Sequence, residues 1–325
     1  MKIRRLRYTD YPKIKKMISY LDTQDGNDFV KNILEEPISI LNNIMPLKYK
    51  FLPESYVIPE NNDINGLITV CESQGNPFKI NITRLIFKQN LLIAGKQLID
   101  FVVSKYGAKG ANSFIAFVDE CHDELSSLFI NGCGFRQCSY ENLWKLENFK
   151  PETKDCANFK PFNKDDAKSV AELYNSELDN LYKPSMERIP EEYIEPVFMG
   201  FRNYYKNRYV LKYGDKITAY LSITTSDNMN YILDISTCDG YSTNYDEILN
   251  FGLFEISRRK TKFTAFLKHR QYAKNADNLE EYLHKRNLNC VQTQCVLVKD
   301  FYRPIKETEN IFKAFILGEN SIISD

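Results

Sequence analysis

The densest run of chemically competent side chains is the hexapeptide 119–124, Asp-Glu-Cys-His-Asp-Glu. Its adjacent thiol and imidazole, Cys121 and His122, are groups that can donate or accept a proton in general acid–base catalysis. Carboxylates in the first turn of a helix give the same pattern, because they complement the partial positive charge of the helix N-terminus. The spacing to Cys133 and Cys138 matches no recognised zinc motif. We keep Cys121 as a candidate acid or base, and we expect no metal site.

A second candidate is Asp234, which lies within the apolar run 231–235. A carboxylate in such a run must face a cleft or find hydrogen-bond donors, because burying an unpaired charge is costly. Carboxylates in such surroundings are candidates for proton transfer. Asp234 is therefore either an active acid or the remnant of one.

Composition limits the class of protein that carries these groups. A length of 325 residues corresponds to about two domains. The 43 basic and 43 acidic side chains cancel, so no global field attracts nucleic acid or an anionic membrane. No apolar run is long enough to span a bilayer, the N-terminus lacks the pattern of a signal peptide, and the eight cysteines form no CxxC pair. We expect a cytoplasmic protein with reduced thiols and no membrane partner.

Hydrophobic periodicity predicts the elements that position the candidate residues. Strands are predicted where apolar residues alternate, and helices where they recur at every third or fourth position. Gly107 and Gly132 are placed to end two of the helices. The expected elements of the first half are a helical stretch at 28–41, a hairpin of 55–58 and 66–72, a strand at 78–87, a helix at 94–106, a strand at 113–118, a helix at 123–131 and a strand at 137–146.

The same order of elements returns in the second half. The helical face of Ile14 and Met17 reappears 153 positions later at Ala167 and Val170. Later elements follow at similar offsets, which indicates a tandem duplication. We predict a first domain at 1–149, a polar linker at 150–160, a second domain at 161–304 and a C-terminal tail at 305–325 with a short helix around 311–317.

Each copy resembles the GNAT superfamily of acyl-CoA N-acyltransferases. The resemblance is carried by the strand 80–87, the loop and helix 88–99, and the sequence Asn-Gly-Cys-Gly-Phe at 131–135. It covers residues 1–304 in order. It implies an α/β fold of two GNAT-like domains, each with a mixed, mostly antiparallel central sheet flanked by helices.

The resemblance also implies where an acyl-CoA would bind. In this family a Gln/Arg-x-x-Gly-x-Gly/Ala loop opens a helix, so that backbone amides and the helix N-terminus face the pyrophosphate of coenzyme A. Gln89 and Ala94 match this motif, whereas Leu92 replaces its central glycine. Gly95 would allow the loop a shifted path, and Lys96 would reach a phosphate. The alternative is a loop whose apolar residues belong to the core and that binds no cofactor.

Acyl transfer to an amine needs a polarised carbonyl and a base. The resemblance implies that a backbone amide near Leu85, Ile86 and Phe87 polarises the acyl carbonyl. The candidate base is Glu72, the nearest carboxylate on the preceding strand; its alternative is a solvated strand end. The tyrosine that serves the family as an acid falls on Ile130, which cannot donate a proton.

The second copy departs from the motif. Its segment 238–247 has no phosphate loop, and its acidic residues would repel a pyrophosphate, so we expect no coenzyme A there. Asn244 and Glu247 form a predicted capping pair. We interpret the basic run 268–270 as a solvated strand end.

These observations favour an N-acyltransferase, most simply an N-acetyltransferase. Acetyl-CoA or another acyl-CoA would bind the first domain and acylate a small-molecule or peptide amine. The alternative is a non-catalytic GNAT-like module that binds a protein or metabolite. A third possibility, acceptance of aminoacyl-tRNA as in related tandem folds, is disfavoured by the zero net charge, and we expect no nucleic-acid partner. The sequence leaves the oligomeric state open.

Overall fold

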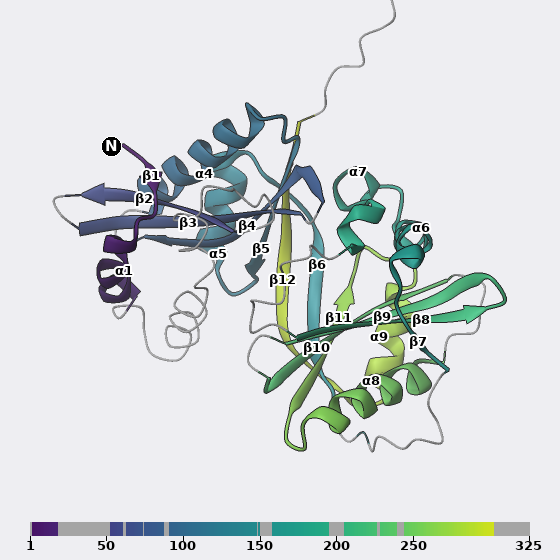
Figure 1. Ribbon diagram of the computed structural model, residues 1–325. Helices are drawn as coiled ribbons and strands as arrows, with labels where there is room; N and C mark the ends of the chain where they lie inside the picture. Colours follow the sequence, from purple (N-terminus) through teal and green to yellow (C-terminus); the bar gives the residue numbers. More distant parts are fainter. Residues whose placement is uncertain are drawn as a thin grey trace, which may run out of the picture.

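The computed structural model describes residues 2–18, 53–60, 63–73, 75–87, 91–147, 149, 158–194, 205–225, 228–238 and 244–301 (Figure 1). The expected helical stretch at 28–41, most of the predicted linker and the predicted tail lie outside these residues.

Twelve strands form one continuous sheet in the order β1-β2-β3-β4-β5-β12-β6-β11-β10-β9-β8-β7. The strands are β1 (Arg4–Arg5), β2 (Glu54–Glu60), β3 (Asp63–Ser73), β4 (Asn76–Phe87), β5 (Ser113–Asp119), β6 (Arg136–Lys145), β7 (Lys160–Pro161), β8 (Tyr205–Tyr213), β9 (Lys216–Thr225), β10 (Asn230–Thr237), β11 (Thr264–Arg270) and β12 (Asn289–Asp300). Most neighbouring pairs are antiparallel, and β4–β5 and β10–β11 are the parallel ones.

Helices flank both faces of this sheet. They are α1 (Tyr11–Ile18), α4 (Leu91–Gly107), α5 (Asp123–Ser127), α6 (Ala167–Glu177), α7 (Lys183–Met186), α8 (Tyr245–Arg259) and α9 (Ala276–Lys285). Shorter turns of other helical types are η1 (Tyr8–Asp10), η2 (Leu128–Gly132), η4 (Lys164–Asp166) and η5 (Pro190–Tyr193). None of the helices in the described ranges is long and apolar enough to cross a membrane.

The two halves exchange their last strands. β12, the last described strand of the chain, lies between β5 and β6 of the first half and is antiparallel to both. β6 in turn pairs with β11 of the second half. In Figure 1 the yellow β12 runs beside the blue-green β6 at the centre of the molecule. Each half therefore completes the sheet of the other.

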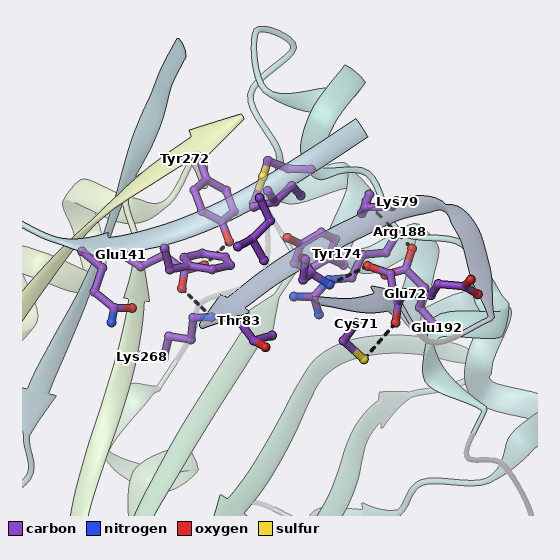
Figure 2. A pocket seen from close by; sticks show the side chains of 17 residues that line it. Cys71, Glu72, Lys79, Thr83, Glu141, Tyr174, Arg188, Glu192, Lys268 and Tyr272 are labelled. Atoms are coloured by element: carbon purple, nitrogen blue, oxygen red, sulfur yellow. Dashed lines mark hydrogen bonds and ion pairs between the residues drawn. The ribbon is translucent and has the colours of Figure 1, made fainter. Parts of the chain in front are cut away.

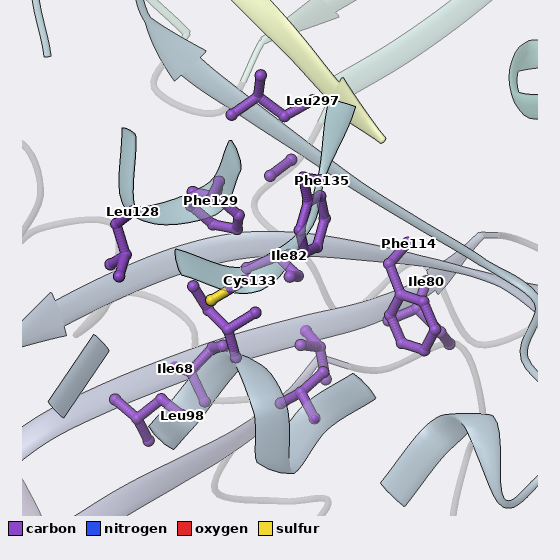
Figure 3. Close-up of a cluster of buried hydrophobic side chains, with 14 of the residues drawn as sticks. Ile68, Ile80, Ile82, Leu98, Phe114, Leu128, Phe129, Cys133, Phe135 and Leu297 are labelled. Atoms are coloured by element: carbon purple, nitrogen blue, oxygen red, sulfur yellow. The ribbon is translucent and has the colours of Figure 1, made fainter. Parts of the chain in front are cut away.

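The hydrophobic cores show the same exchange. Leu297 of β12 is fully buried in the core beneath α4, with Leu128, Phe129 and Phe135 (Figure 3). Trp144 of β6 is buried in the opposite core, beneath α8 and α9. Burial of apolar side chains is the main favourable term in folding, so each core depends on a strand of the other half.

Most predicted elements are confirmed. The helix predicted at 94–106 is α4, and Gly107 is its last residue. The helix predicted at 123–131 begins at Asp123 but continues as the π-helical turn η2, in which the consecutive residues Leu128 and Phe129 are both buried. The tandem order of helices and strands recurs after residue 160.

The strand exchange predicts that one mutation destabilises both halves. Leu297→Ala removes a buried side chain from the first core and should lower the free energy of unfolding by about 2–5 kcal/mol. The single tryptophan, Trp144, reports on the second core. Urea unfolding followed by its fluorescence should shift to lower urea by the same amount as the circular dichroism signal.

Val291→Ala is the matched control, since Val291 lies on the same strand but is 49% exposed. It should change stability by no more than about 0.5 kcal/mol. If Leu297→Ala leaves the urea midpoint of the tryptophan fluorescence transition unchanged, the two halves do not depend on each other for stability.

Candidate functional site

A gap opens in the sheet where β4 and β5 diverge. The two strands pair in parallel from Lys79 with Ser113 to Ile82 with Ala116. β4 continues to Phe87 and β5 to Asp119, yet the register between them ends at Ala116. Backbone groups on the facing edges beyond that point are not used for pairing between these two strands.

A bulge in β4 lies at the start of this gap. Ile82 pairs with Val70 and Arg84 pairs with Thr69, so Thr83 is an extra residue on β4. A bulge bends its strand and redirects side chains. Thr83 is exposed, and its hydroxyl donates to the Thr69 carbonyl at 3.3 Å.

A cavity of about 650 Å³ opens on this gap. Thr83 and Phe117, the residues that directly follow the last β4–β5 pair, both line it. Its other walls come from both halves of the chain, including Glu72, Tyr174, Arg188 and Tyr272 (Figure 2). Small-molecule sites commonly have this size and occur between domains.

Ion pairs occupy several of the charged lining residues. Lys268 Nζ lies 2.5 Å from Glu141 Oε2, and the Tyr272 hydroxyl donates to the same carboxylate at 2.5 Å. Lys79 Nζ lies 3.9 Å from Glu192 Oε1. Burial lowers the pKa of Lys79, Glu192 opposes this shift, and the charge of Arg188 reinforces it.

Glu72 is the one candidate acid or base that lines the cavity. It lies near the end of β3, partly buried, and two register shifts between β3 and β4 surround it. Its neighbours Cys71 and Ser73 line the cavity as well. The Cys71 thiol donates to the Glu72 carbonyl at 3.3 Å.

Cys121 and Asp234 lie elsewhere. Cys121 is exposed in the turn before α5, and its amide donates to Asp119 at 3.1 Å. The predicted helix N-terminus follows directly, with Asp123 and Glu124 in its first turn. The described residues contain no group of three or more His, Cys, Asp or Glu side chains that could hold a metal ion.

Asp234 belongs to a charge cluster of the second half. Its carboxylate lies 3.5 Å from the Arg270 guanidinium. Burial favours a raised pKa, but the charges of Arg270 and Lys268 outweigh it and hold the pKa of Asp234 below its usual value. Asp234 is thus an ion-pair partner within the second half, where it does not line the cavity.

The equivalent gap of the second half is filled by protein side chains. β10 and β11 pair as far as Asp234 with Lys268. Beyond that pair, the Arg270 guanidinium donates to the Ile235 carbonyl and to the Ser236 hydroxyl at 3.0 Å. It also lies 3.4 Å from Glu177.

Glu177 completes the filling of this gap. Its carboxylate accepts a hydrogen bond from the Thr237 amide on β10. Burial raises the pKa of Glu177, whereas the Arg270 charge and the Thr237 amide oppose the shift. The parallel pairs of the two halves begin at Lys79 with Ser113 and at Asn230 with Thr264, so by register Arg270 corresponds to Asp119 at the end of β5.

The interpretation of residues 268–270 as a solvated strand end is wrong. His269 and Arg270 are only 1% and 4% exposed, and Lys268 lines the cavity. Their partners Glu141 and Glu177 come from distant parts of the chain, so a local pattern could not reveal them. The predicted capping of α8 is confirmed, because Asn244 accepts from the Glu247 amide at 3.4 Å.

The residues predicted for cofactor binding lie around the end of β4 and the start of α4. Gln89 lies outside the described residues, and Leu92 is already part of α4. Leu85 and Phe87 pack partly buried against the first core, and Ile86 is buried on the face of α1.

The remaining predicted residues lie within α4. Ala94 is buried, and Gly95 packs against Leu128 and Phe87. Lys96 is exposed; its Nζ donates to the Gly132 carbonyl at 2.6 Å and lies 3.0 Å from Asp100. Lys96 would have to leave these partners to reach a phosphate.

Several solved structures share the fold. A tandem GNAT protein from the clavulanic acid biosynthesis pathway aligns with a TM-score of 0.57 and 10% identity, over 92% of this chain and 98% of that one. A GCN5-related N-acetyltransferase from Sphaerobacter thermophilus gives 0.54 and 9%, over 94% and 96%. A Drosophila protein gives 0.52 and 8%, over 92% and 98%.

No protein-family model matches the sequence, and neither does any curated protein sequence. At identities near 10% the structural likeness shows the fold alone. The chain has the tandem GNAT fold predicted from the order of its elements.

The packing of Gly95 leads to a prediction about its role. A Cβ at this position would lie 2.6 Å from Leu128 Cδ2, and Leu128 is buried. Gly95→Ala should therefore lower the free energy of unfolding by about 1–3 kcal/mol through overpacking. Gly107→Ala in the same helix meets no atom within 4 Å and should be neutral or stabilising by up to about 1 kcal/mol. If urea unfolding shows the same loss of free energy of unfolding for Gly95→Ala and Gly107→Ala, packing does not require a glycine at position 95.

Proposed function

We propose that this protein is an acyl-CoA-dependent N-acyltransferase whose acyl-CoA site lies in the first half. The observation that carries the proposal is the cavity that opens on the gap between β4 and β5. An acyl-pantetheine arm in that gap meets backbone groups of β4 that β5 does not use. The acceptor amine approaches from the cavity, where Thr83 and Phe117 mark the meeting point.

The start of α4 supports the same location. α4 begins at Leu91, only three residues after the end of β4, which is one of the two strands that border the gap. A helix of 17 residues presents amide donors and a partial positive charge at its N-terminus, which suits a pyrophosphate. The backbone supplies these groups, so the departure at Leu92 removes no donor.

Glu72 is the proposed general base. It takes one proton from the ammonium of the acceptor, and the neutral amine nitrogen then bonds to the acyl carbonyl carbon and loses its second proton to solvent. The carbon–sulfur bond breaks, and the coenzyme A thiolate leaves and takes a proton from solvent. Placing the two reactants together in one cavity supplies much of the rate enhancement in such transfers.

The filled gap of the second half supports assignment to the first. Arg270 and Glu177 occupy the space and the backbone groups that an acyl-pantetheine arm would need. Opening that gap would break a buried ion pair, which costs about 3–5 kcal/mol when one partner is removed. The second half therefore contributes a wall of the acceptor cavity instead of a second acyl-CoA site.

The alternative is a module that binds a ligand without catalysis. The bonds of Lys96 to Gly132 and Asp100 favour it, because that cation is engaged away from the gap. The two functions differ in acyl-CoA binding and in turnover, so each receives its own test.

Acyl-CoA binding is expected to stabilise the folded protein. At 100 times its dissociation constant, acetyl-CoA or a longer acyl-CoA should add about 2.7 kcal/mol, measured as a rise in the thermal midpoint. Thr83→Trp should abolish the rise by filling the gap. Thr224→Trp is the control, since Thr224 makes a similar bond to a neighbouring strand, 3.5 Å to the Ile232 carbonyl. No stabilisation by any acyl-CoA would refute the enzyme proposal.

Glu72→Gln should separate binding from catalysis. Loss of a general base lowers kcat by about 10²–10⁴-fold, while acyl-CoA should still raise the thermal midpoint. Turnover is followed as release of the coenzyme A thiol with a panel of primary amines. Glu124→Gln on exposed α5 should leave turnover unchanged. If Glu72→Gln retains full turnover, Glu72 is not the base.

A further inference from the structure

Among the described residues, Arg188 is one of three cations that line the cavity. It lies between α7 and η5 and lines the cavity together with Tyr174 and Lys79 (Figure 2). Within the described parts of the chain, no ion pair joins its guanidinium to a carboxylate. By contrast, the neighbouring cations Lys79 and Lys268 are paired with Glu192 and Glu141.

The Arg188 guanidinium is held in place by packing. Its central carbon lies 4.1 Å from the centre of the Tyr174 ring and 5.9 Å from that of Tyr193. Its backbone is fixed by two bonds to Asn175: the Arg188 amide donates at 2.9 Å, and the Asn175 side chain donates to the Arg188 carbonyl at 2.8 Å. A stacked guanidinium keeps its in-plane donors available for an anion.

A carboxylate whose charge acts on Arg188 is already engaged by another arginine. Among the groups that act on Arg188, Asp234 is the carboxylate, and it lies 3.5 Å from Arg270. Arg270 also faces Tyr174, at 4.8 Å from the ring centre. Arg188 is therefore the cavity cation that has no carboxylate within ion-pair distance among the described residues, and desolvating a charge without such a partner is costly.

We infer that the acceptor amine carries a carboxylate, which binds the Arg188 guanidinium in a bidentate manner. This inference rests on the proposed function and defines its substrate class as small amino acids and their relatives. A planar carboxylate matches the guanidinium fork and gives Arg188 the ion-pair partner that the described residues do not supply. With the carboxylate held at Arg188, the amine of the same molecule extends toward Thr83 and the gap. Diamines that lack an anionic group would leave Arg188 unbalanced.

The test measures amino acid binding without acyl-CoA, so that it stands apart from the test of catalysis. The twenty common amino acids, their decarboxylated amines and phosphoethanolamine are added at millimolar concentration, and the thermal midpoint is recorded. At least one amino acid should stabilise the protein more than its decarboxylated amine does. Isothermal titration then gives the dissociation constant of that amino acid.

Two substitutions of Arg188 test the contact itself. Arg188→Lys keeps the charge but loses the fork, and should weaken binding about tenfold; Arg188→Met should weaken it about 100-fold. Arg258→Lys is the matched control, because Arg258 also faces an aromatic ring, Phe254, but is itself exposed near the end of α8 and does not line the cavity. It should leave the dissociation constant unchanged. Circular dichroism checks that each variant is folded. If Arg188→Met does not fold, Arg188→Lys alone provides the test of the contact.

The outcomes distinguish the inference from the proposed function. The inference is overturned if the decarboxylated amines stabilise the protein as much as their amino acids do, or if phosphoethanolamine stabilises it more. It is also overturned if no amino acid stabilises the protein, or if folded Arg188 variants bind the amino acid with unchanged affinity. Acetyl transfer to a decarboxylated amine at the rate of its amino acid would support the function and overturn the inference. Amino acid binding that requires Arg188, without any acyl-CoA binding, would support the carboxylate site and refute the acyltransferase.

Discussion

The architecture depends on the hydrogen bonding of strand edges at the centre of the sheet. β5 and β6 are neighbours in sequence, but β12 separates them and pairs with both. Removing β12 would leave two inner strands with unpaired backbone groups, which is costly in a buried sheet. The same exchange packs Ile115 of the first half against Val296 and Tyr174 in one core. The cavity has walls from both halves because the sheet is continuous across them.

One structural plan has produced two different local outcomes. Both halves contain a parallel strand pair that diverges after four or five paired residues. In the second half, Arg270 and Glu177 fill the space that divergence creates, and they bond the backbone groups it exposes. In the first half the residue equivalent to Arg270 is Asp119, which accepts hydrogen bonds from the Gln292 side chain at 2.8 Å and from the Cys121 amide at 3.1 Å. The halves thus differ in where this charged residue bonds: Arg270 bonds across the gap to β10, whereas Asp119 bonds to β12 and to the turn before α5.

The sequence was sufficient for features that depend on local pattern. Helix α4, its end at Gly107, the Asn244 cap and the tandem order of elements all follow from periodicity and capping chemistry. Strand exchange was not predictable, because alternation fixes which face a strand presents but not its neighbour. Charged residues near the cavity were misjudged for a related reason. The run 268–270 resembles a solvated strand end until Glu141 and Glu177 are placed beside it.

Glu72 and Arg188 illustrate how the site divides between the two halves. Glu72 was accessible to sequence reasoning because it lies on a first-half strand next to the motif-bearing segment. Arg188 had no local signal, since its significance comes from lining a cavity against β3 and β4 of the other half. In the proposed function, acyl transfer is therefore assigned to the first half and acceptor selection largely to the second. Under this assignment, substitutions around Tyr174 and Arg188 change the acceptor without altering β4, so a half with a filled gap still contributes to the proposed function.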